Sequence, residues 1–364
     1  MDASQTIAHD DIKPGIAPED INTLQTKEKQ WVIFGIKLGL TVGILAFLVW
    51  RAIAADAFTD LIHQQKNWSL LAAAAFLCLV GVMITIVRWY MLVRVIGIEC
   101  KFSGAVRIGF LGYMFNLVPM GGIVAGDVVK AVMLGRESQK QYAKSFASVF
   151  IDRVIGLYAL FLMALLFIYT TGFSQIDSAP IRVAVVTMIV CAAAGTFGFA
   201  LVLLPDISNG WTTRMIGRTP VIGKKLEHLI ESIQMYRSCP LTLLVTLIMS
   251  FGVHLSFALG LYLIASGLYG MQHPSLMYHL AISPISFATG AIPLAAGPFE
   301  YVLDTLYPLV PSVGASIKDG QGLVVAICYR VITIAIAMIG VGYYLTGREE
   351  VAEVIHTVQE EEVA

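Results

Sequence analysis

The chain has 364 residues, of which 57% are hydrophobic and 13% are charged, and its net charge is −1. Soluble domains carry roughly 25% charged residues, so this composition excludes an ordinary soluble enzyme and a disordered chain. The lack of a basic domain argues against nucleic acid as a partner, and five cysteines without a CxxC pair exclude a disulfide scaffold. The remaining fold class is an all-α polytopic membrane protein.

Six long apolar runs follow a polar segment at residues 1–30, which we interpret as a cytoplasmic tail. Each run is close to the ~20 residues that cross about 30 Å of hydrocarbon. The runs cover residues 31–50, 69–87, 145–170, 181–204, 241–265 and 322–345. They predict six full membrane spans.

Two further apolar stretches, residues 102–134 and 275–310, are interrupted midway by proline and glycine and carry acidic side chains. A broken backbone at membrane depth persists only where protein or a water-filled cavity satisfies its polar groups. We therefore expect each stretch to form a re-entrant helical hairpin that enters and leaves the bilayer on one side.

The distribution of lysine and arginine supports this topology. With the amino terminus inside, the inner connections hold seventeen of these residues, eight of them within 88–144, and the outer connections hold four. Basic residues concentrate on the cytoplasmic side of membrane proteins. The bias requires both broken stretches to be re-entrant, and it predicts two cytoplasmic termini in a cell membrane.

The two broken stretches resemble each other and predict an internal repeat. Each has a proline, Pro119 or Pro293, followed by small residues and then by an acid, Asp127 or Glu300, that opens a new apolar segment. The span before the first stretch runs inward and the span before the second runs outward, so the repeats are inverted. Inverted repeats with broken helices are typical of secondary transporters.

This pattern divides the chain into two tails and one transmembrane domain. The predicted parts are a polar tail at 1–30, the transmembrane domain at 31–346, repeats at about 69–204 and 241–345 joined by a cytoplasmic amphipathic segment at 205–240, and an acidic cytoplasmic tail at 347–364.

Charged side chains inside the apolar segments are the candidates for function. They are Asp127, Asp152, Arg153, Glu300, Asp304 and Arg330. Each charge costs about 2.5–3.5 kcal/mol at a helix centre, so these residues must pair or line a wet cavity. Because acid and arginine occur once in each repeat, we expect reciprocal pairing between the repeats. Ion pairs that only hold the hairpins in place remain an alternative.

The functional interpretation of these charges is a site for a lipid headgroup. Arg153 and Arg330 have the guanidinium geometry that binds phosphate through two parallel hydrogen bonds. Gly121 and Gly122 would let the backbone approach a ligand closely. Asn116 either donates to a phosphate or caps a broken helix, and we favour the cap.

Four segments together resemble a known family: RWYMLVRVIGI, FLGYMFNLVPMGGIVAGDVVKAVML, SFASVFIDRVIGL and IPLAAGPFEYVL. They are similar to the lysylphosphatidylglycerol-synthase transmembrane family, a flippase-like family, over nearly all of residues 31–346. In the last segment the family reads closer to PxPGGLGxxE, but Glu300 still matches.

The resemblance implies two opposed re-entrant hairpins and movement of a lipid between leaflets. Its site positions in this chain are Asp127, Asp152, Arg153, Glu300 and Arg330. Larger relatives carry a soluble aminoacyl-transfer domain, and this sequence has no such stretch, so we expect no lysyl-lipid synthesis by the chain alone.

Our first hypothesis is therefore a transporter for a phospholipid or glycolipid with a polar headgroup. No HExxH, GxSxG or working phosphate-loop motif is present, so we expect no catalytic residues, metal or cofactor. One alternative is a polyprenyl-phosphate glycosyltransferase that uses Asp56 and Asp60, which lie in an outer connection. Another is a non-transporting scaffold for a separate lipid-modifying enzyme. The sequence leaves the lipid, the energy source and the oligomeric state open.

Overall fold

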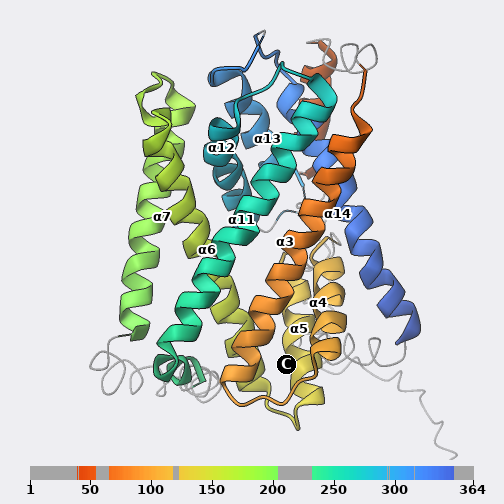
Figure 1. Ribbon diagram of the computed structural model, residues 1–364, viewed down its shortest axis with the longest axis vertical. Helices are drawn as coiled ribbons and strands as arrows, with labels where there is room; N and C mark the ends of the chain where they lie inside the picture. The colour runs from red at the N-terminus through yellow and green to blue at the C-terminus, as the bar shows by residue number, and fades with distance from the viewer. Residues whose placement is uncertain are drawn as a thin grey trace, which may run out of the picture.

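A computed structural model describes residues 39, 41–54, 65–117, 123–203, 232–292, 294, 296–314 and 316–347, which are mainly α-helical (Figure 1). Among these residues, five helices are long and apolar enough to cross a membrane. They are α3 (Trp68–Val95), α6 (Tyr142–Thr170), α7 (Ala179–Leu203), α11 (Pro240–Tyr269) and α14 (Gln321–Thr346). The chain is thus a multi-pass membrane protein.

Of the first predicted span, residues 31–50, the structure describes residues 39 and 41–50. The part that is described belongs to a shorter apolar helix, Thr41–Ala54. The tails at 1–30 and 348–364 and most of the segment at 205–240 also lie outside the described residues.

Local sequence signals set the beginnings of the long helices. Asn67 precedes α3, and its Oδ1 accepts a hydrogen bond from the Leu70 amide at 3.3 Å. Pro240 occupies the first turn of α11, where a missing N–H costs nothing. Gly320 precedes α14 with a φ of 85°, a conformation that glycine adopts readily.

Two pairs of short helices occupy the predicted broken stretches. The first pair is α4 (Phe102–Leu117) and α5 (Ile123–Glu137), and the second is α12 (Leu276–Ala288) and α13 (Pro298–Leu306). At 1.5 Å per residue these helices are about 14–24 Å long, whereas α3 is about 42 Å long. The two pairs lie toward opposite ends of the bundle (Figure 1).

The long helices α3 and α11 pack against each other through small residues. A Cβ added to Gly260 would lie 2.9 Å from the Cys78 sulfur, and one added to Gly81 would lie 3.0 Å from the Phe257 ring. Small residues at helix contacts let backbones approach closely in a membrane, where hydrophobic burial contributes little to helix association.

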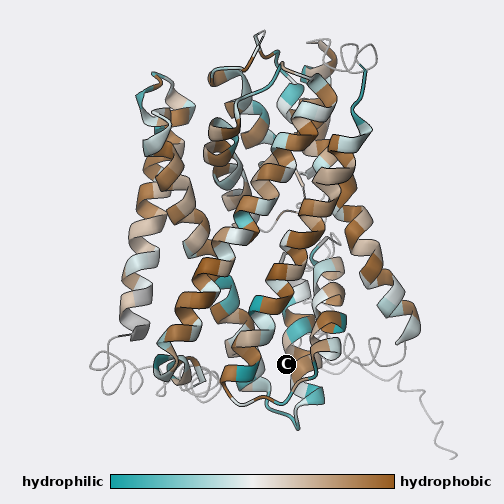
Figure 2. Cartoon of the chain, viewed as in Figure 1, coloured by the Kyte–Doolittle hydropathy of each residue, from teal (hydrophilic) through white to brown (hydrophobic). Residues whose placement is uncertain are grey.

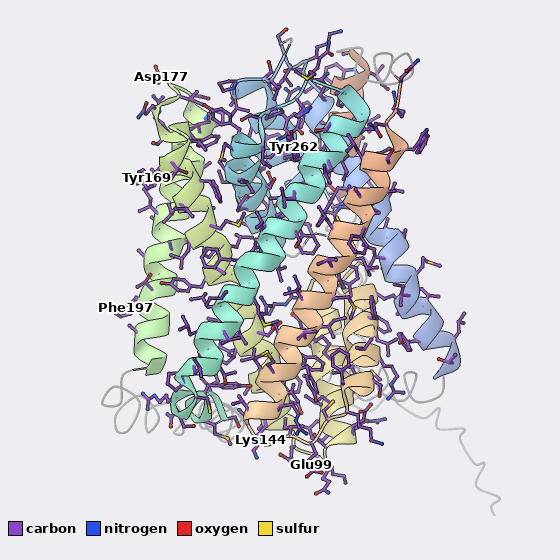
Figure 3. The ribbon with its side chains drawn as sticks, viewed as in Figure 1. Glu99, Lys144, Tyr169, Asp177, Phe197 and Tyr262 are labelled. Atoms are coloured by element: carbon purple, nitrogen blue, oxygen red, sulfur yellow. The ribbon has the colours of Figure 1, made fainter. Side chains whose placement is uncertain are left out.

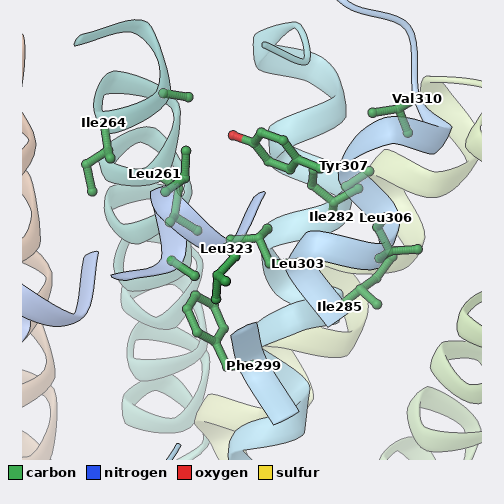
Figure 4. Packing of buried hydrophobic residues seen from close by; sticks show 14 of the residues in the cluster. Leu261, Ile264, Ile282, Ile285, Phe299, Leu303, Leu306, Tyr307, Val310 and Leu323 are labelled. Atoms are coloured by element: carbon green, nitrogen blue, oxygen red, sulfur yellow. The ribbon is translucent and has the colours of Figure 1, made fainter. Parts of the chain in front are cut away.

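A buried apolar cluster surrounds α13. In the close view, Phe299, Leu303 and Leu306 of α13 face side chains from the neighbouring helices, including Leu261, Ile282, Ile285 and Leu323 (Figure 4). This packing places the first turn of α13, with Glu300, in the interior of the bundle.

The outer surface of the bundle has the polarity expected of a membrane protein. Hydrophobic residues dominate the middle of the long helices (Figure 2). Tyr169 and Phe197 project from the outside of α6 and α7, while Asp177 lies at one end of the molecule and Glu99 and Lys144 at the other (Figure 3).

Candidate functional site

A cavity of about 400 Å³ lies inside the bundle. Its walls come from α3, α6, α11 and α14 and from both pairs of short helices, and no described residue of α7 lines it. Ligand pockets span about 300–1,000 Å³, so this cavity is large enough for a small polar group.

The first ion pair of the cavity joins α5 to α6. Arg153 donates from Nε to Asp127 Oδ2 at 2.5 Å and from Nη2 to Asp127 Oδ1 at 2.8 Å. This two-bond geometry is the strong form of an arginine–carboxylate pair. The Arg153 side chain is 44% exposed, and both residues line the cavity.

The second ion pair joins α13 to α14. Arg330 donates from Nε to Glu300 Oε1 at 2.6 Å, and Glu300 Oε2 accepts the Gly297 amide at 2.7 Å. Glu300 therefore caps its own helix and holds Arg330 at the same time. Arg330 lines the cavity, whereas Glu300 lies behind it and is 1% exposed.

These contacts correct the expected pairing between repeats. Each arginine pairs with the acid of its own half, 26 residues earlier for Arg153 and 30 residues earlier for Arg330. The physical reason is local packing, because each long helix follows its short helices in sequence and packs against them.

Asp152 takes part in a third ion pair, whose partner was not predicted from the sequence. Arg88 donates from Nε to Asp152 Oδ1 at 2.8 Å and from Nη1 to Ser250 Oγ at 2.7 Å. Both charged residues are buried. The pair connects α3, α6 and α11.

The predicted end of the second span at residue 87 was wrong. The predicted topology places Arg88 in an inner connection, but α3 continues to Val95. The signal that could have placed Arg88 in the helix is the apolar pattern that continues after it, in the sequence RWYMLV.

Asn116 acts as the cap that the sequence favours. Its Oδ1 accepts the Gly126 amide at 3.1 Å and so ties α4 to the first turns of α5. The two glycines predicted to approach a ligand, Gly121 and Gly122, lie outside the described residues.

Asp304 is buried but does not line the cavity. Its Oδ1 accepts the Leu323 amide at 3.0 Å, and its Oδ2 lies 3.7 Å from Arg51 Nη1. Asp304 therefore holds α13 against the start of α14. The alternative candidates Asp56 and Asp60 lie outside the described residues.

His254 and Lys130 also line the cavity. His254 Nε2 lies 2.8 Å from the Gly156 carbonyl oxygen, so this histidine is bonded to the backbone of α6. Lys130 of α5 is not among the predicted site residues, because the predicted topology counts it with the basic residues of the inner side. Its position three residues after Asp127, on the same helix face, is the signal that could have found it.

Comparison with known proteins identifies the family. No curated protein matches the chain. A family profile described as the lysylphosphatidylglycerol synthase TM region matches residues 33–340, which is most of the chain and includes every residue that lines the cavity. This chain therefore belongs to the lysylphosphatidylglycerol synthase transmembrane family and is a membrane protein of lipid metabolism or transport.

Proposed function

We propose that this protein moves a lipid with a polar phospho- or glyco- headgroup between the two leaflets of a membrane. The observation that carries the proposal is the charged cavity enclosed by both pairs of short helices. In a membrane, ionisable residues that face the interior of a bundle commonly mark the path of a substrate. The headgroup would enter this cavity while the acyl chains remain in lipid.

The proposed topology has two re-entrant hairpins in inverted repeats. The helices α4, α5, α12 and α13 are each shorter than the ~30 Å hydrocarbon layer, and the two pairs lie at opposite ends of the bundle. Each pair also follows a long helix and precedes another, α3 and α6 in the first half and α11 and α14 in the second. With the excess of basic residues on the inner side, this topology places both termini in the cytoplasm.

The arginines have free donors for a headgroup. Among the described residues, Arg330 uses only Nε in its pair, and Arg153 uses Nε and Nη2. Arg153 Nη1 and both terminal nitrogens of Arg330 therefore have no hydrogen-bond partner within the described parts of the chain and can donate to oxygen atoms of a ligand. Each pair joins a short helix to a long one, so a ligand that competes for the arginine would loosen that helix contact.

Transport by purified protein in vesicles tests the proposal. Fluorescent lipids in one leaflet are chemically quenched, and the rate at which protected lipids reach that leaflet is measured. We expect Arg153→Gln and Arg330→Gln to reduce the rate at least tenfold while the protein stays folded.

A matched control is Arg182→Gln on α7. It removes an arginine paired with Asp177 at 2.7 Å, but Arg182 is exposed and outside the cavity. This variant should move lipid at the wild-type rate. Wild-type rates in Arg153→Gln and Arg330→Gln would refute the proposed site.

The same assay separates the alternatives. Lipid movement by the isolated protein, without chemical change of the lipid, supports transport rather than catalysis. A protein that moves no lipid but forms a stable complex with a lipid-modifying enzyme would favour the scaffold hypothesis.

A further inference from the structure

The charges of the cavity do not balance. Three arginines each have a carboxylate within 2.8 Å: Arg88 with Asp152, Arg153 with Asp127, and Arg330 with Glu300. Lys130 also lines the cavity and adds a fourth cation. With every group in its ordinary ionised form, the described charges sum to one positive charge.

The ammonium group of Lys130 is the charge left over. Lys130 is 7% exposed, and within the described parts of the chain it forms no hydrogen bond or ion pair. Its Nζ lies 4.4 Å from the centroid of the Trp89 ring. A cation–π contact offsets only part of the free energy that burial of an ion costs.

The neighbouring acids do not remove this excess. Asp127 and Asp152 are the acids that act on Lys130, and both are already bonded to an arginine. The positive charges of Arg88 and Arg153 therefore offset most of the attraction of these two carboxylates for the lysine.

Packing fixes the position of the lysine. A Cβ added to Gly112 of α4 would lie 2.4 Å from Lys130 Cγ, so the aliphatic stem lies tightly against α4. The stem is held by α4 and the ammonium group by the Trp89 ring of α3. The side chain of Lys130 is thus held in one place in the cavity wall, as a preformed binding site requires.

We propose that Lys130 binds the phosphate of the transported lipid, and that the substrates of this protein are lipids with a net negative, phosphate-bearing headgroup. A phosphodiester with one negative charge would balance the cavity. Arg153, whose Nη1 is unoccupied among the described residues, supplies a second donor without leaving Asp127. This inference rests on the proposed function and specifies its substrate.

Binding is measured first, with Trp89 as the reporter. A variant with Trp31, Trp50, Trp68 and Trp211 replaced by Phe keeps Trp89 as its single tryptophan. The full chain is reconstituted in nanodiscs and titrated with phosphatidylglycerol, with a neutral glucosyl diacylglycerol, or with inorganic phosphate. We expect a saturable change in Trp89 fluorescence with phosphatidylglycerol and none with the neutral glycolipid.

Substitutions of the lysine then test its role. Lys130→Met keeps the length of the side chain and should weaken phosphatidylglycerol binding at least ~10-fold, because a charged hydrogen bond is lost. Lys130→Arg should restore most of it. The matched control, Lys101→Met, changes an exposed lysine outside the cavity and should bind as the wild type does.

The outcomes distinguish the substrate inference from the proposed function. If phosphatidylglycerol and the glycolipid are moved at equal rates and Lys130→Met changes nothing, transport stands and the role of Lys130 is wrong. If no lipid is moved but binding of phosphatidylglycerol depends on Lys130, the proposed function fails and the anion site stands. Binding of inorganic phosphate alone would identify free phosphate as the ligand and overturn the lipid assignment.

Discussion

The ion pair between Arg88 and Asp152 gives the clearest test of how the charges of this protein are held. We expect Arg88→Met to destabilise the fold strongly, because it leaves the Asp152 carboxylate buried at 3% exposure without its partner. Removing one member of a buried ion pair costs about 3–5 kcal/mol. The serine partner adds little to this cost, since Ser250 Oγ still donates to the Thr246 carbonyl at 2.7 Å.

A double-mutant cycle separates the cost of losing the ion pair from the cost of leaving one buried charge without a partner. Arg88→Met combined with Asp152→Asn removes both charges, so the double variant should recover at least about 1–2 kcal/mol of what Arg88→Met alone loses. The free energy of unfolding is measured in mixed micelles by titration with a denaturing detergent, and circular dichroism follows the helices.

An exposed ion pair serves as the control in this experiment. Arg182→Met breaks a pair with Asp177 whose side chains are 66% and 91% exposed, and exposed pairs contribute at most about 1 kcal/mol. The reasoning is refuted if Arg88→Met costs no more than Arg182→Met, or if the double variant is no more stable than Arg88→Met.

Three further predictions concern helix contacts and pH. Gly126→Ala places a Cβ 2.0 Å from the Gly112 carbonyl oxygen, so unfolding in detergent should become easier by about 1–3 kcal/mol or more; Gly342→Ala, with open space around it, should not destabilise the protein. Asn116→Ala removes the hydrogen bond to α5 and should cost about 1 kcal/mol, seen as faster amide exchange in the first turns of that helix; unchanged exchange would contradict the cap. Burial lowers the pKa of His273, in the connection after α11, from 6.5. The unfolded chain therefore binds this proton first, and stability should fall as pH drops below about 6.5. In His273→Gln the free energy of unfolding should depend less on pH between pH 7.5 and 5.5 than in the wild type. A loss of stability as steep as that of the wild type would contradict the role of His273.

Hydrophobic length allowed most of the long helices to be predicted. The apolar runs at 145–170, 181–204, 241–265 and 322–345 correspond to α6, α7, α11 and α14, because each contains enough consecutive apolar residues to cross a bilayer. The break in the second of the two remaining stretches, between α12 and α13, was also predicted, since proline and glycine stop a helix by steric and hydrogen-bonding effects that act locally. The break predicted at Pro119 lies outside the described residues.

Partner choice in the cavity was not predictable in the same way. The cost of a buried charge identifies Asp127, Arg153, Glu300 and Arg330 as residues that need partners, but it does not say which partners. That depends on which short helix packs against which long helix, a tertiary property. The place of Lys130 in the cavity wall was not predicted for a related reason. A lysine near the end of an apolar run is normally assigned to a loop, and only the packing around its aliphatic stem shows otherwise.

The sequence distance between paired charges bears on how the protein is made. Arg88, Asp127, Asp152 and Arg153 all find their partners within residues 88–153. Once α6 has been synthesised and inserted into the membrane, both members of the Arg88–Asp152 pair and of the Arg153–Asp127 pair are therefore present. These two ion pairs can form before α11 to α14 are synthesised. Arg88 and Arg153 therefore need not remain unpaired in the bilayer while the rest of the chain is made.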